Sequence, residues 1–374
     1  MARPLQGIRV LEMGTFITGP AAAMLLGDLG AEVIKLEQPG TGDPYRAFGG
    51  DLYSPQFQTY NRNKKSVEID PRDPQDLSRL DELVRGADVF IQNFRPGVAE
   101  RLNVDARRLQ GLNPRLVYAA ITGFGGDGPH KDRPAFDTVA QASAGFLRLL
   151  INPEHPRVVG PALADAVTGF YMAYGVLAAL YEREKTGKGR HVETSMFEAL
   201  AHFNLDDFTQ YLSAGRVMDA FSRPHASQSY VFECGDGGWI ALHISSPPKF
   251  WEKLVEALDV PEMLEREEFA SRPARIASYE KVIGFLAPIF KSQPRAHWEE
   301  RLAAFGVPHS PMLDAKEVLE GPLARHHGIV TEAEGPRGAF RTIRPPLRFD
   351  GEVEREVTAP PELGADNDSV LGGK

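Results

Sequence analysis

Cysteine is almost absent from this 374-residue chain, which contains only Cys234. A single cysteine cannot form an internal disulfide or a cysteine-based zinc cage, and such scarcity is typical of proteins in a reducing cytoplasm. We therefore expect a cytoplasmic protein without a metal site. No apolar run approaches the roughly 20 residues that cross a membrane. The N-terminal residues lead straight into a strand pattern without the apolar stretch of a signal peptide, so we expect no membrane partner.

A surplus of positive charge is also missing, since 51 acidic residues outnumber 42 Lys and Arg and give a net charge of −9. This balance argues against a general nucleic-acid binder, and a polyanionic ligand would need a local basic patch. The G-x-G-x-x-G spacing of dinucleotide-binding loops is absent from residues 14–20, which weakens a dinucleotide interpretation. The chain is longer than one hydrophobic core usually serves, so we expect two domains.

Apolar runs of strand length alternate with helical patterns over the first 200 residues. Strands are expected at residues 7–13, 30–37, within 61–70, and at 88–92, 116–121 and 190–196. Helices are expected at residues 21–29, 74–85, 135–145 and from about 160 to 187, with a loop over 41–60. This alternation predicts an open, mostly parallel, Rossmann-like α/β sheet. Ligands of such sheets bind at the carboxyl ends of the strands.

The rest of the chain has a different pattern. A hairpin pattern surrounds the Gly-Asp-Gly-Gly run at residues 235–238, and helical patterns follow at 248–258, 278–291 and 294–305. We expect a small α+β domain at residues 230–325, after a linker at 201–229 that contains the end of a helix over 198–215. Residues 326–374 read as an extended C-terminal segment, and residues 330–374 are expected to return to the large domain of residues 1–200.

The helix that begins near Asp165 is the best specified in the chain. Its apolar and aromatic side chains recur at steps of three and four residues, at Val167, Phe170, Tyr174, Leu177 and Tyr181. One helical face is therefore expected to be apolar. Asp165 lies at or beside the N-terminus, where orphan backbone N–H groups and the helix dipole favour an ionised carboxylate at neutral pH. The residues alone leave two roles open: a helix cap worth about 1 kcal/mol, and a nucleophile toward an activated acyl group.

Short sequence blocks occur in a characteristic order along almost the whole chain. They lie at residues 5–11, 30–37, 62–66, 93–97, 113–116, 123–125, 135–142, 164–165, 168–169, 183–189 and 195–196. In this order they resemble family III of the CoA-transferases, of which formyl-CoA transferase is the best-known type. The resemblance implies that Asp165 is the catalytic nucleophile. It also implies a homodimer of two interlocked, ring-like chains, with acyl-CoA as a substrate and no permanently bound cofactor.

The mechanism that the resemblance implies has two covalent stages. Asp165 attacks the acyl-CoA and forms a mixed anhydride, and the released CoA thiolate then converts it into an aspartyl-CoA thioester and a free acid. The acceptor carboxylate repeats these steps in reverse. The expected activity is CoA transfer to a short-chain carboxylic acid, dicarboxylic acids included. Each step exchanges acyl groups of similar energy, so neither ATP nor a metal is required.

The resemblance also carries over candidate CoA contacts. They are Phe16, Ile17, Thr18, Gln38, Lys64, Lys65, Asn93, Phe94, Arg95, Arg101 and Met196, with Arg62 as a further basic candidate. For each basic residue a solvated surface position is an equal alternative. Formyl-CoA transferase has an arginine where this chain has Gln38 and a lysine where it has Pro134, although Lys131 and Arg133 are close by. We therefore expect a rearranged set of CoA phosphate contacts.

The acid-binding side is less specified. Residues 222–230 lack the glycine run with which formyl-CoA transferase covers its aspartate, so formate and oxalate are not implied. Arg46, Arg223 and His225 are candidates for binding an acceptor carboxylate, with a surface position as the alternative for each. Asp137 is expected either to support the site or to solvate a helix end.

A 2-methylacyl-CoA racemase of the same superfamily is the alternative function. That branch uses a His-Asp pair, with the histidine at the position of Phe136. A phenylalanine cannot exchange a proton, so Phe136 favours a transferase. A CoA-binding protein without turnover is a further alternative, and the intact Asp165 speaks against it.

Overall fold

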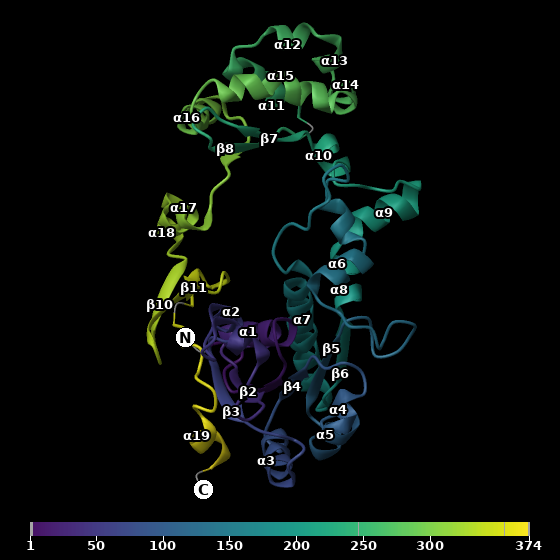
Figure 1. Ribbon diagram of the computed structural model, residues 1–374, viewed down its shortest axis with the longest axis vertical. Helices are drawn as coiled ribbons and strands as arrows, with labels where there is room; N and C mark the ends of the chain where they lie inside the picture. The colour runs from purple at the N-terminus through teal and green to yellow at the C-terminus, as the bar shows by residue number, and fades with distance from the viewer. Residues whose placement is uncertain (1–2, 246, 355, 373–374) are drawn as a thin grey trace. The chain divides into compact units, whose positions relative to one another are not determined.

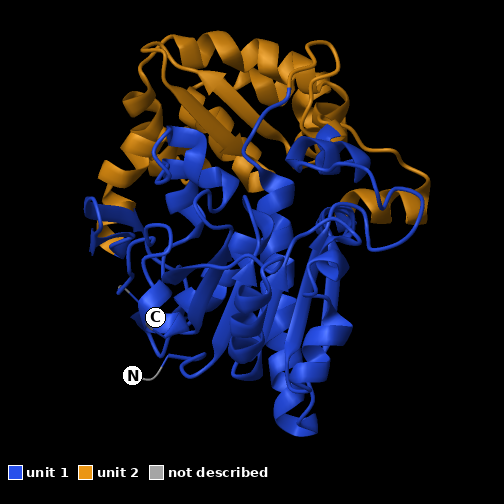
Figure 2. Cartoon of the chain, turned by 60° about the horizontal axis from the view of Figure 1, so that its bottom comes forward, with its two compact units in different colours: residues 1–147, 158–205, 327–374 blue, residues 148–157, 206–326 orange. Residues whose placement is uncertain are grey.

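The computed structural model describes residues 3–245, 247–354 and 356–372. The chain divides into two compact units (Figure 2). Unit 1 comprises residues 1–147, 158–205 and 327–374, and unit 2 comprises residues 148–157 and 206–326. The segment 201–229, expected to be a linker, is divided between the units, and residues 206–229 belong to unit 2 together with the short segment 148–157.

A six-stranded parallel sheet forms the centre of unit 1, in the order β3-β2-β1-β4-β5-β6 (Figure 1). The strands are β1 (Arg9–Met13), β2 (Glu32–Glu37), β3 (Lys64–Glu68), β4 (Val89–Gln92), β5 (Val117–Thr122) and β6 (His191–Ser195). Leu11 of β1 pairs with Ile34 on one side and with Phe90 on the other. The expected open, parallel α/β sheet is confirmed. The order of the strands reverses between β1 and β4, which is the point where such sheets bind ligands.

Helices cover both faces of this sheet. The helices of unit 1 are α1 (Thr18–Asp28), η1 (Pro44–Gly49), α2 (Pro55–Tyr60), α3 (Pro74–Arg85), α4 (Val98–Arg101), α5 (Ala106–Leu112), α6 (Asp137–Ser143), α7 (Leu163–Thr186), α8 (Met196–Phe203) and α19 (Asn367–Leu371). Successive strand side chains point to opposite faces, so Val10 packs in one core with residues of α1 and α7, while Leu11 packs in the other with residues of α3 and α5. The short helix η2 (Phe146–Leu149) spans the boundary between the units.

Helix α7 packs closely on α1 through a glycine. A Cβ on Gly169 would lie 2.9 Å from Ala21 Cβ and 3.1 Å from the carbonyl oxygen of Thr18, so only glycine permits this approach. The expected apolar face was only partly right. Val167 is buried, but the aromatic residues of that face point outward, with exposed fractions of 61% for Phe170, 70% for Tyr174 and 67% for Tyr181. The side chains that face the core are smaller, such as Ala173 and Val176.

The length of α7 also corrects an expectation about membranes. Its 24 residues include an 18-residue window with a mean hydropathy of 1.4, enough in length and composition for a membrane span. Half of that window is buried inside the protein. Because α7 packs on α1 and on the sheet, the buried half of this window belongs to the core of unit 1.

A group of buried charges lies beneath the first strand. Glu12, Lys35 and Lys64 have no exposed side-chain surface, and each lysine Nζ lies 3.1 Å from a carboxylate oxygen of Glu12. Lys35 also contacts Asp43 at 3.0 Å. Burial lowers the pKa of Lys64 to about 8, against the opposing effect of Glu12. These charges are compensated within the protein, which makes them part of the scaffold.

The C-terminal segment returns to unit 1 and covers the edge of β3. It contains β10 (Val330–Gly335), β11 (Gly338–Ile343), β12 (Arg348–Phe349), β13 (Glu352–Val353) and α19. Asp366 Oδ2 accepts a hydrogen bond from the backbone N–H of Ser66 at 2.9 Å, and Asn367 Oδ1 accepts one from Glu68 N–H at 2.8 Å. Side chains of the tail thus pair with the backbone groups that an edge strand leaves open, and α19 lies beside β3 (Figure 1).

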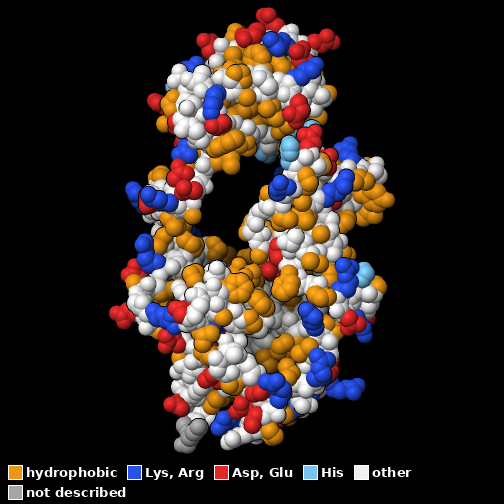
Figure 3. Space-filling view, viewed as in Figure 1, with side chains coloured by type: hydrophobic (Ala, Val, Ile, Leu, Met, Phe, Trp, Pro, Cys, Tyr) orange, Lys and Arg blue, Asp and Glu red, His pale blue; other side chains and the backbone are white. Residues whose placement is uncertain are grey.

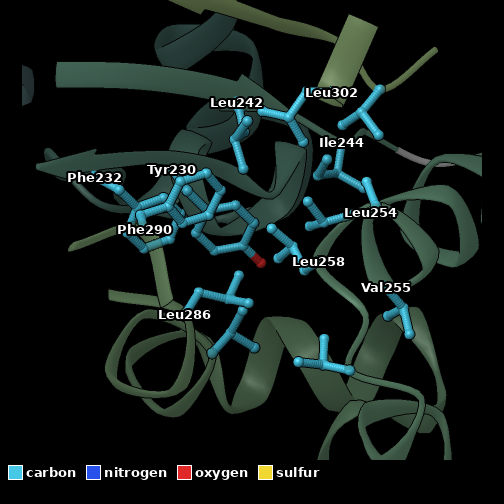
Figure 4. Packing of buried hydrophobic residues seen from close by; sticks show 14 of the residues in the cluster. Tyr230, Phe232, Leu242, Ile244, Leu254, Val255, Leu258, Leu286, Phe290 and Leu302 are labelled. Carbon is cyan, nitrogen blue, oxygen red and sulfur yellow. The ribbon is translucent and has the colours of Figure 1, made fainter. Parts of the chain in front are cut away.

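Unit 2 has its own sheet and core. Its antiparallel sheet contains β7 (Ser229–Glu233), β8 (Trp239–His243) and β9 (His309–Pro311) in that order. The helices are α9 (Leu205–Ala214), α10 (Ser222–Ser227), α11 (Pro248–Leu258), α12 (Glu262–Glu265), α13 (Glu267–Ala270), α14 (Arg272–Ala277), α15 (Tyr279–Lys291), α16 (Arg295–Phe305), α17 (Ala315–Glu320) and α18 (Pro322–His327). Stacked rings hold the sheet on α15, with centroids 4.6 Å apart for Phe232 and Phe290 (Figure 4).

Several segments differ from the expectations. Residues 41–60 contain η1 and α2, each begun by a proline and a side-chain cap, from Asp43 and Ser54. The helix expected over residues 198–215 is interrupted at Asn204 and forms α8 and α9, and the expected linker contains α10. Residues 306–374 carry more regular structure than expected, in elements too short for a periodic pattern to be recognised.

Candidate active site

Asp165 lies in the first turn of α7, next to the first residue of α6. That residue, Asp137, caps α7 from the side. Its Oδ1 accepts hydrogen bonds from the backbone N–H groups of Ala164 at 2.8 Å and Asp165 at 3.4 Å, and its Oδ2 accepts one from Gln141 Nε2 at 2.6 Å. Of the two roles left open for Asp165, that of the helix cap is taken by Asp137.

The surroundings of Asp165 disfavour its charge. Burial, and after it the negative charge of Asp137, raise the pKa of Asp165 from the ordinary value of 3.8 to about 7. The expectation of full ionisation at neutral pH is therefore wrong, because desolvation outweighs the helix terminus. Among the described residues, no basic side chain contributes to this shift. Such a poorly solvated carboxylate is a stronger nucleophile, once ionised, than an exposed one.

Asp165 lines a cavity of about 500 Å³ where β1, β4 and β5 end. Its wall consists of Thr15, Phe16, Ile17, Thr18, Tyr45, Phe48, Asn93, Phe94, Arg95, Pro96, Val98, Ile121, Thr122, Gly123, Lys131, Arg133, Ala135, Phe136, Asp165 and Met196. The volume is within the range of small-molecule sites. The cavity lies at the strand ends that flank the reversal of strand order, where the sheet topology predicts a ligand.

The loop after β1 is fixed by side chains from two other elements. Asn93, which follows β4, accepts a hydrogen bond from Thr15 N–H at 2.9 Å and donates to Thr15 O at 2.8 Å and Thr18 Oγ1 at 2.9 Å. Asp43 Oδ1 accepts from Phe16 N–H at 3.0 Å. These contacts hold Phe16 at a φ of 62°, a strained conformation for a residue with a side chain. Phe16 forms part of the cavity wall in this conformation.

Aromatic side chains surround Phe16 on the same wall. Its ring centroid lies 5.3 Å from that of Tyr45, 6.5 Å from Phe48 and 6.0 Å from Phe136, all in edge-to-face geometry. Phe48 and Phe136 are each 62% exposed. Burial and the negative charge of Asp165 contribute to raising the pKa of Tyr60, and both also act on Tyr45. These phenols therefore lie in the electrostatic range of Asp165.

The family of this chain follows from its similarity to known proteins. The family model described as CoA-transferase family III matches residues 5–367. This chain belongs to CoA-transferase family III. A formyl-CoA:oxalate CoA-transferase of Streptomyces avermitilis is 33% identical over 400 residues, covering 100% of this chain and 96% of the relative. The human succinyl-CoA:glutarate CoA-transferase is 30% identical over 377 residues, covering 99% of this chain and 85% of the relative.

A solved structure supports the same assignment. The crystal structure of a CAIB/BAIF family protein from Brucella suis has a TM-score of 0.88 and 29% sequence identity, and the match covers 99% of both chains. The expected family is thus confirmed, and the protein is an enzyme with CoA-transferase activity. The named transferases among its relatives do not favour the racemase alternative.

The cavity of this CoA-transferase brings together many of the residues that the sequence singled out. They are Phe16, Ile17, Thr18, Asn93, Phe94, Arg95, Phe136, Asp165 and Met196. Gln38 lines a smaller neighbouring cavity of about 290 Å³, which shares Thr15 and Phe94 with the first. Within this smaller cavity Gln38 Oε1 accepts a hydrogen bond from Arg72 at 3.1 Å. For all of these cavity residues, contact with CoA stays a prediction.

Two of the basic CoA candidates are buried and saturated. Lys64 Nζ bonds to Glu12, to Asn61 Oδ1 at 2.8 Å and to the carbonyl oxygen of Pro20 at 2.9 Å. Arg62 bonds to both carboxylate oxygens of Asp28, at 2.9 and 2.6 Å. Neither can reach a CoA phosphate, so both assignments are wrong. A strand pattern on sequence alone does not reveal which lysines point inward.

Two other basic candidates lie outside the cavities described above. Lys65 is 43% exposed and pairs with Glu32 at 2.7 Å. Its side chain points to the opposite face of β3 from that of Lys64. Arg101 is exposed and lines neither the large nor the small cavity. Both side chains are accessible from solvent, and their contact with CoA stays a prediction.

Arg46 cannot bind an acceptor carboxylate as expected. Its side chain has no exposed surface, and its Nε and Nη2 each donate to a carboxylate oxygen of Glu37 at 2.7 Å. Its Nη1 donates to the carbonyl oxygens of Leu52 and Pro361, both at 3.2 Å. Arg46 therefore fixes η1, which carries Tyr45 and Phe48, and its guanidinium group is fully used.

His225 lies in unit 2, on α10. Its ring stacks between those of Phe221 and Tyr279, with centroids 6.1 and 4.1 Å away. Its proposed contact with the acceptor acid stays a prediction. Across the described residues, no group of three or more His, Cys, Asp or Glu side chains is placed to hold a metal ion.

Part of the cavity wall was not expected from the sequence. Tyr45 and Phe48 lie in the segment that was expected to be a loop, and Lys131 and Arg133 were noted only as neighbours of Pro134. The aromatic content of residues 41–60 was a usable signal, since exposed aromatic side chains in a loop that precedes a strand often mark a binding site.

Proposed function

We propose that Asp165 is the nucleophile of a CoA transfer from an acyl-CoA donor to a free short-chain carboxylic acid. The supporting observation is a poorly solvated carboxylate at the start of α7 on the wall of the cavity at the sheet's switch point. An ionised Asp165 Oδ attacks the thioester carbonyl, the C–S bond breaks, and CoA leaves as its thiolate. The product is a mixed anhydride between the aspartate and the acyl group.

The remaining steps conserve one thioester and one carboxylate. The thiolate attacks the aspartyl carbonyl of the anhydride, which releases the donor acid and leaves an aspartyl-CoA thioester. The acceptor carboxylate attacks this thioester and expels the thiolate, which then attacks the acceptor carbonyl of the second anhydride. Asp165 leaves as the free carboxylate, and no proton, ATP or resident cofactor is consumed.

CoA is proposed to lie along the strand ends of the large unit. The loop that Asn93 and Asp43 fix would present Phe16 and Ile17 to the pantetheine chain. Arg95, Lys131 and Arg133 are exposed basic side chains on the cavity wall, and they are proposed to bind the CoA phosphates in place of Lys64. Guanidinium groups suit this task, since they bind phosphate in a bidentate way.

We also propose that the protein is a homodimer in the cytoplasm without a membrane or nucleic-acid partner. The exposed aromatic side chains of α7 support a partner on that face, because large apolar patches on a soluble protein mark interaction sites. Figure 3 shows apolar side chains gathered over α7 and over α9. Analytical ultracentrifugation of the wild type and of Tyr174→Asp tests this: the variant should shift toward monomer.

The nucleophile is tested by trapping it. Wild-type enzyme and acyl-CoA are mixed with hydroxylamine, and peptides are analysed by mass spectrometry for a hydroxamate at Asp165. Asp165→Asn should bind acyl-CoA but form no adduct and catalyse no exchange. Exchange near the wild-type rate in this variant would remove Asp165 from the mechanism. A parallel incubation in deuterated water tests the racemase alternative, which requires exchange of the α-proton.

A further inference from the structure

One wall of the cavity presents apolar rings to solvent beside the nucleophile. Phe48 and Phe136, each 62% exposed, meet through the ring of Phe16, and Phe48 also lies 5.0 Å from Tyr45. Leaving two phenylalanine rings open to water is unfavourable by about 25 cal/mol for each Å² of apolar surface. A ligand that covers these rings recovers this free energy, so the wall favours an apolar group.

Within η1, which carries Tyr45 and Phe48, the basic side chain among the described residues is not free to bind a second carboxylate. Arg46 is the arginine nearest in sequence to Tyr45 and Phe48, and Glu37 occupies its guanidinium group. Around the nucleophile, the charged neighbour that acts on Asp165 is Asp137, which is also negative. Tyr45 and Tyr60 complete these surroundings with neutral hydroxyl groups.

The basic side chains of the cavity belong to other parts of its wall. Arg95 follows β4 and also lines a second cavity, which shares residues 94–96 with the first. Arg133 lies against the ring of Phe124, with its guanidinium carbon 5.6 Å from the centroid. None of these groups acts on the pKa of Asp165. They are the groups that we have proposed above for the CoA phosphates.

From these observations we infer that the exchanged acid is a monocarboxylic acid whose acyl group is apolar, with an aryl-substituted chain as the best fit. This inference rests on the CoA transfer proposed above. The single carboxylate reacts at the aspartyl thioester: its oxygen forms a bond to the aspartyl carbonyl carbon, the C–S bond breaks, and CoA leaves as thiolate. The apolar chain covers Phe48 and Phe136. A second carboxylate would instead face these rings and the negative charge of Asp137, which is unfavourable in poorly solvated surroundings.

Three acids of similar length separate the contributions. Pentanoate and glutarate differ by one terminal carboxylate, and 3-phenylpropionate adds a ring. With butyryl-CoA as donor, kcat/KM should be highest for 3-phenylpropionate and at least about tenfold lower for glutarate than for pentanoate, since unpaired burial of a charge discriminates strongly. A kcat/KM for glutarate equal to or above that for pentanoate overturns the inference while leaving CoA transfer intact. Failure of every acyl-CoA donor tested to form the hydroxamate at Asp165 would instead overturn Asp165 as the nucleophile.

Substitutions on the aromatic wall test where the acyl group lies. Phe48→Ala and Phe136→Ala should each lower kcat/KM for 3-phenylpropionate about tenfold and for glutarate less than twofold, while Phe48→Leu retains most of the activity. Phe349→Ala removes an equally large ring that is 50% exposed on β12, and it should leave both values unchanged. Thermal unfolding and CoA affinity are measured for every variant. An equal loss for both acids, at unchanged stability and CoA affinity, contradicts the inference.

Discussion

The carboxylate of Asp137 accepts a hydrogen bond from the backbone N–H of Asp165 at 3.4 Å and from that of Ala164 at 2.8 Å. One acidic residue thus caps the helix that carries the other, which is the proposed nucleophile. This arrangement places two negative groups together and contributes, after burial, to the raised pKa of Asp165. The pair links the start of α6 to that of α7, so the position of Asp165 and its protonation both depend on Asp137.

The first prediction concerns the pH dependence of the reaction. With a pKa of about 7, Asp165 must lose a proton before it attacks, so kcat/KM for acyl-CoA should rise through that pH. Asp137→Asn removes the neighbouring charge but keeps an oxygen for Ala164 N–H, and its new N–H can meet Gln141 Oε1, which is buried without a partner among the described residues. The acidic limb should therefore move to lower pH. A pH profile of kcat/KM measures it, and an unmoved limb would contradict the role of Asp137.

The second prediction concerns stability. Because the folded pKa of Asp165 is about 7 and the ordinary value is 3.8, the folded state binds more protons than the unfolded state between these values. Stability therefore falls as pH rises through this window. Asp165→Asn abolishes the effect, so it should raise the melting temperature relative to the wild type more at pH 8 than at pH 4. Calorimetry at both pH values checks this, and a difference independent of pH would exclude the raised pKa.

The third prediction concerns Arg46, which the sequence suggested as an acid-binding residue. Arg46→Ala leaves Glu37 buried without its partner and should destabilise unit 1 by about 3–5 kcal/mol. Arg9→Ala is the matched control, since Arg9 and Glu32 are also 2.7 Å apart but 42% and 35% exposed, and it should cost less than about 1 kcal/mol. Urea unfolding measures both. A higher KM for the acid at unchanged stability would instead support acid binding by Arg46.

The fourth prediction concerns the contact between α1 and α7. In Gly169→Ala the new methyl group would meet Ala21 and Thr18, as described above. This contact would push α7 away from α1 at a point about one helical turn after Asp165. We expect a loss of about 1–3 kcal/mol in stability and a roughly tenfold fall in kcat. Gly111→Ala in α5 has no atom within 4 Å of the new Cβ and should leave both unchanged. Equal behaviour of the two variants would show that the close approach is unimportant.

The central strands of the sheet of unit 1, β2, β1, β4 and β5, were predictable because they are largely apolar runs between glycine- or proline-containing loops. Residues such as Val10, Leu11 and Phe90 are buried whichever face they point to, so the pattern identifies the strand without the register. The helix α3 was also predicted at its observed bounds, from Pro74 to Arg85, since a capping Asp73 and a glycine mark its ends. These are local signals, and they need no tertiary information.

The electrostatics of the site could not be predicted in this way. Lys64 and Lys65 are adjacent in sequence, yet one is buried beside Glu12 and the other reaches Glu32 at the surface. Which neighbour points inward depends on the register of β3 against β2. The capping of α7 by Asp137 depends likewise on a contact across 28 residues. Spacing along the chain does not encode such pairings, so the pKa of Asp165 was misjudged.

The pairing of the tail with β3 has a consequence for biosynthesis. The residues that close this edge, Asp366 and Asn367, are separated by about 300 positions from the strand that they cover. On the ribosome, β3 emerges early and waits with open backbone groups while all of unit 2 is translated. Nascent chains are therefore exposed to edge-to-edge association for most of their synthesis, and a premature stop codon near the 3′ end would yield an aggregation-prone product even though every strand of the sheet had been made.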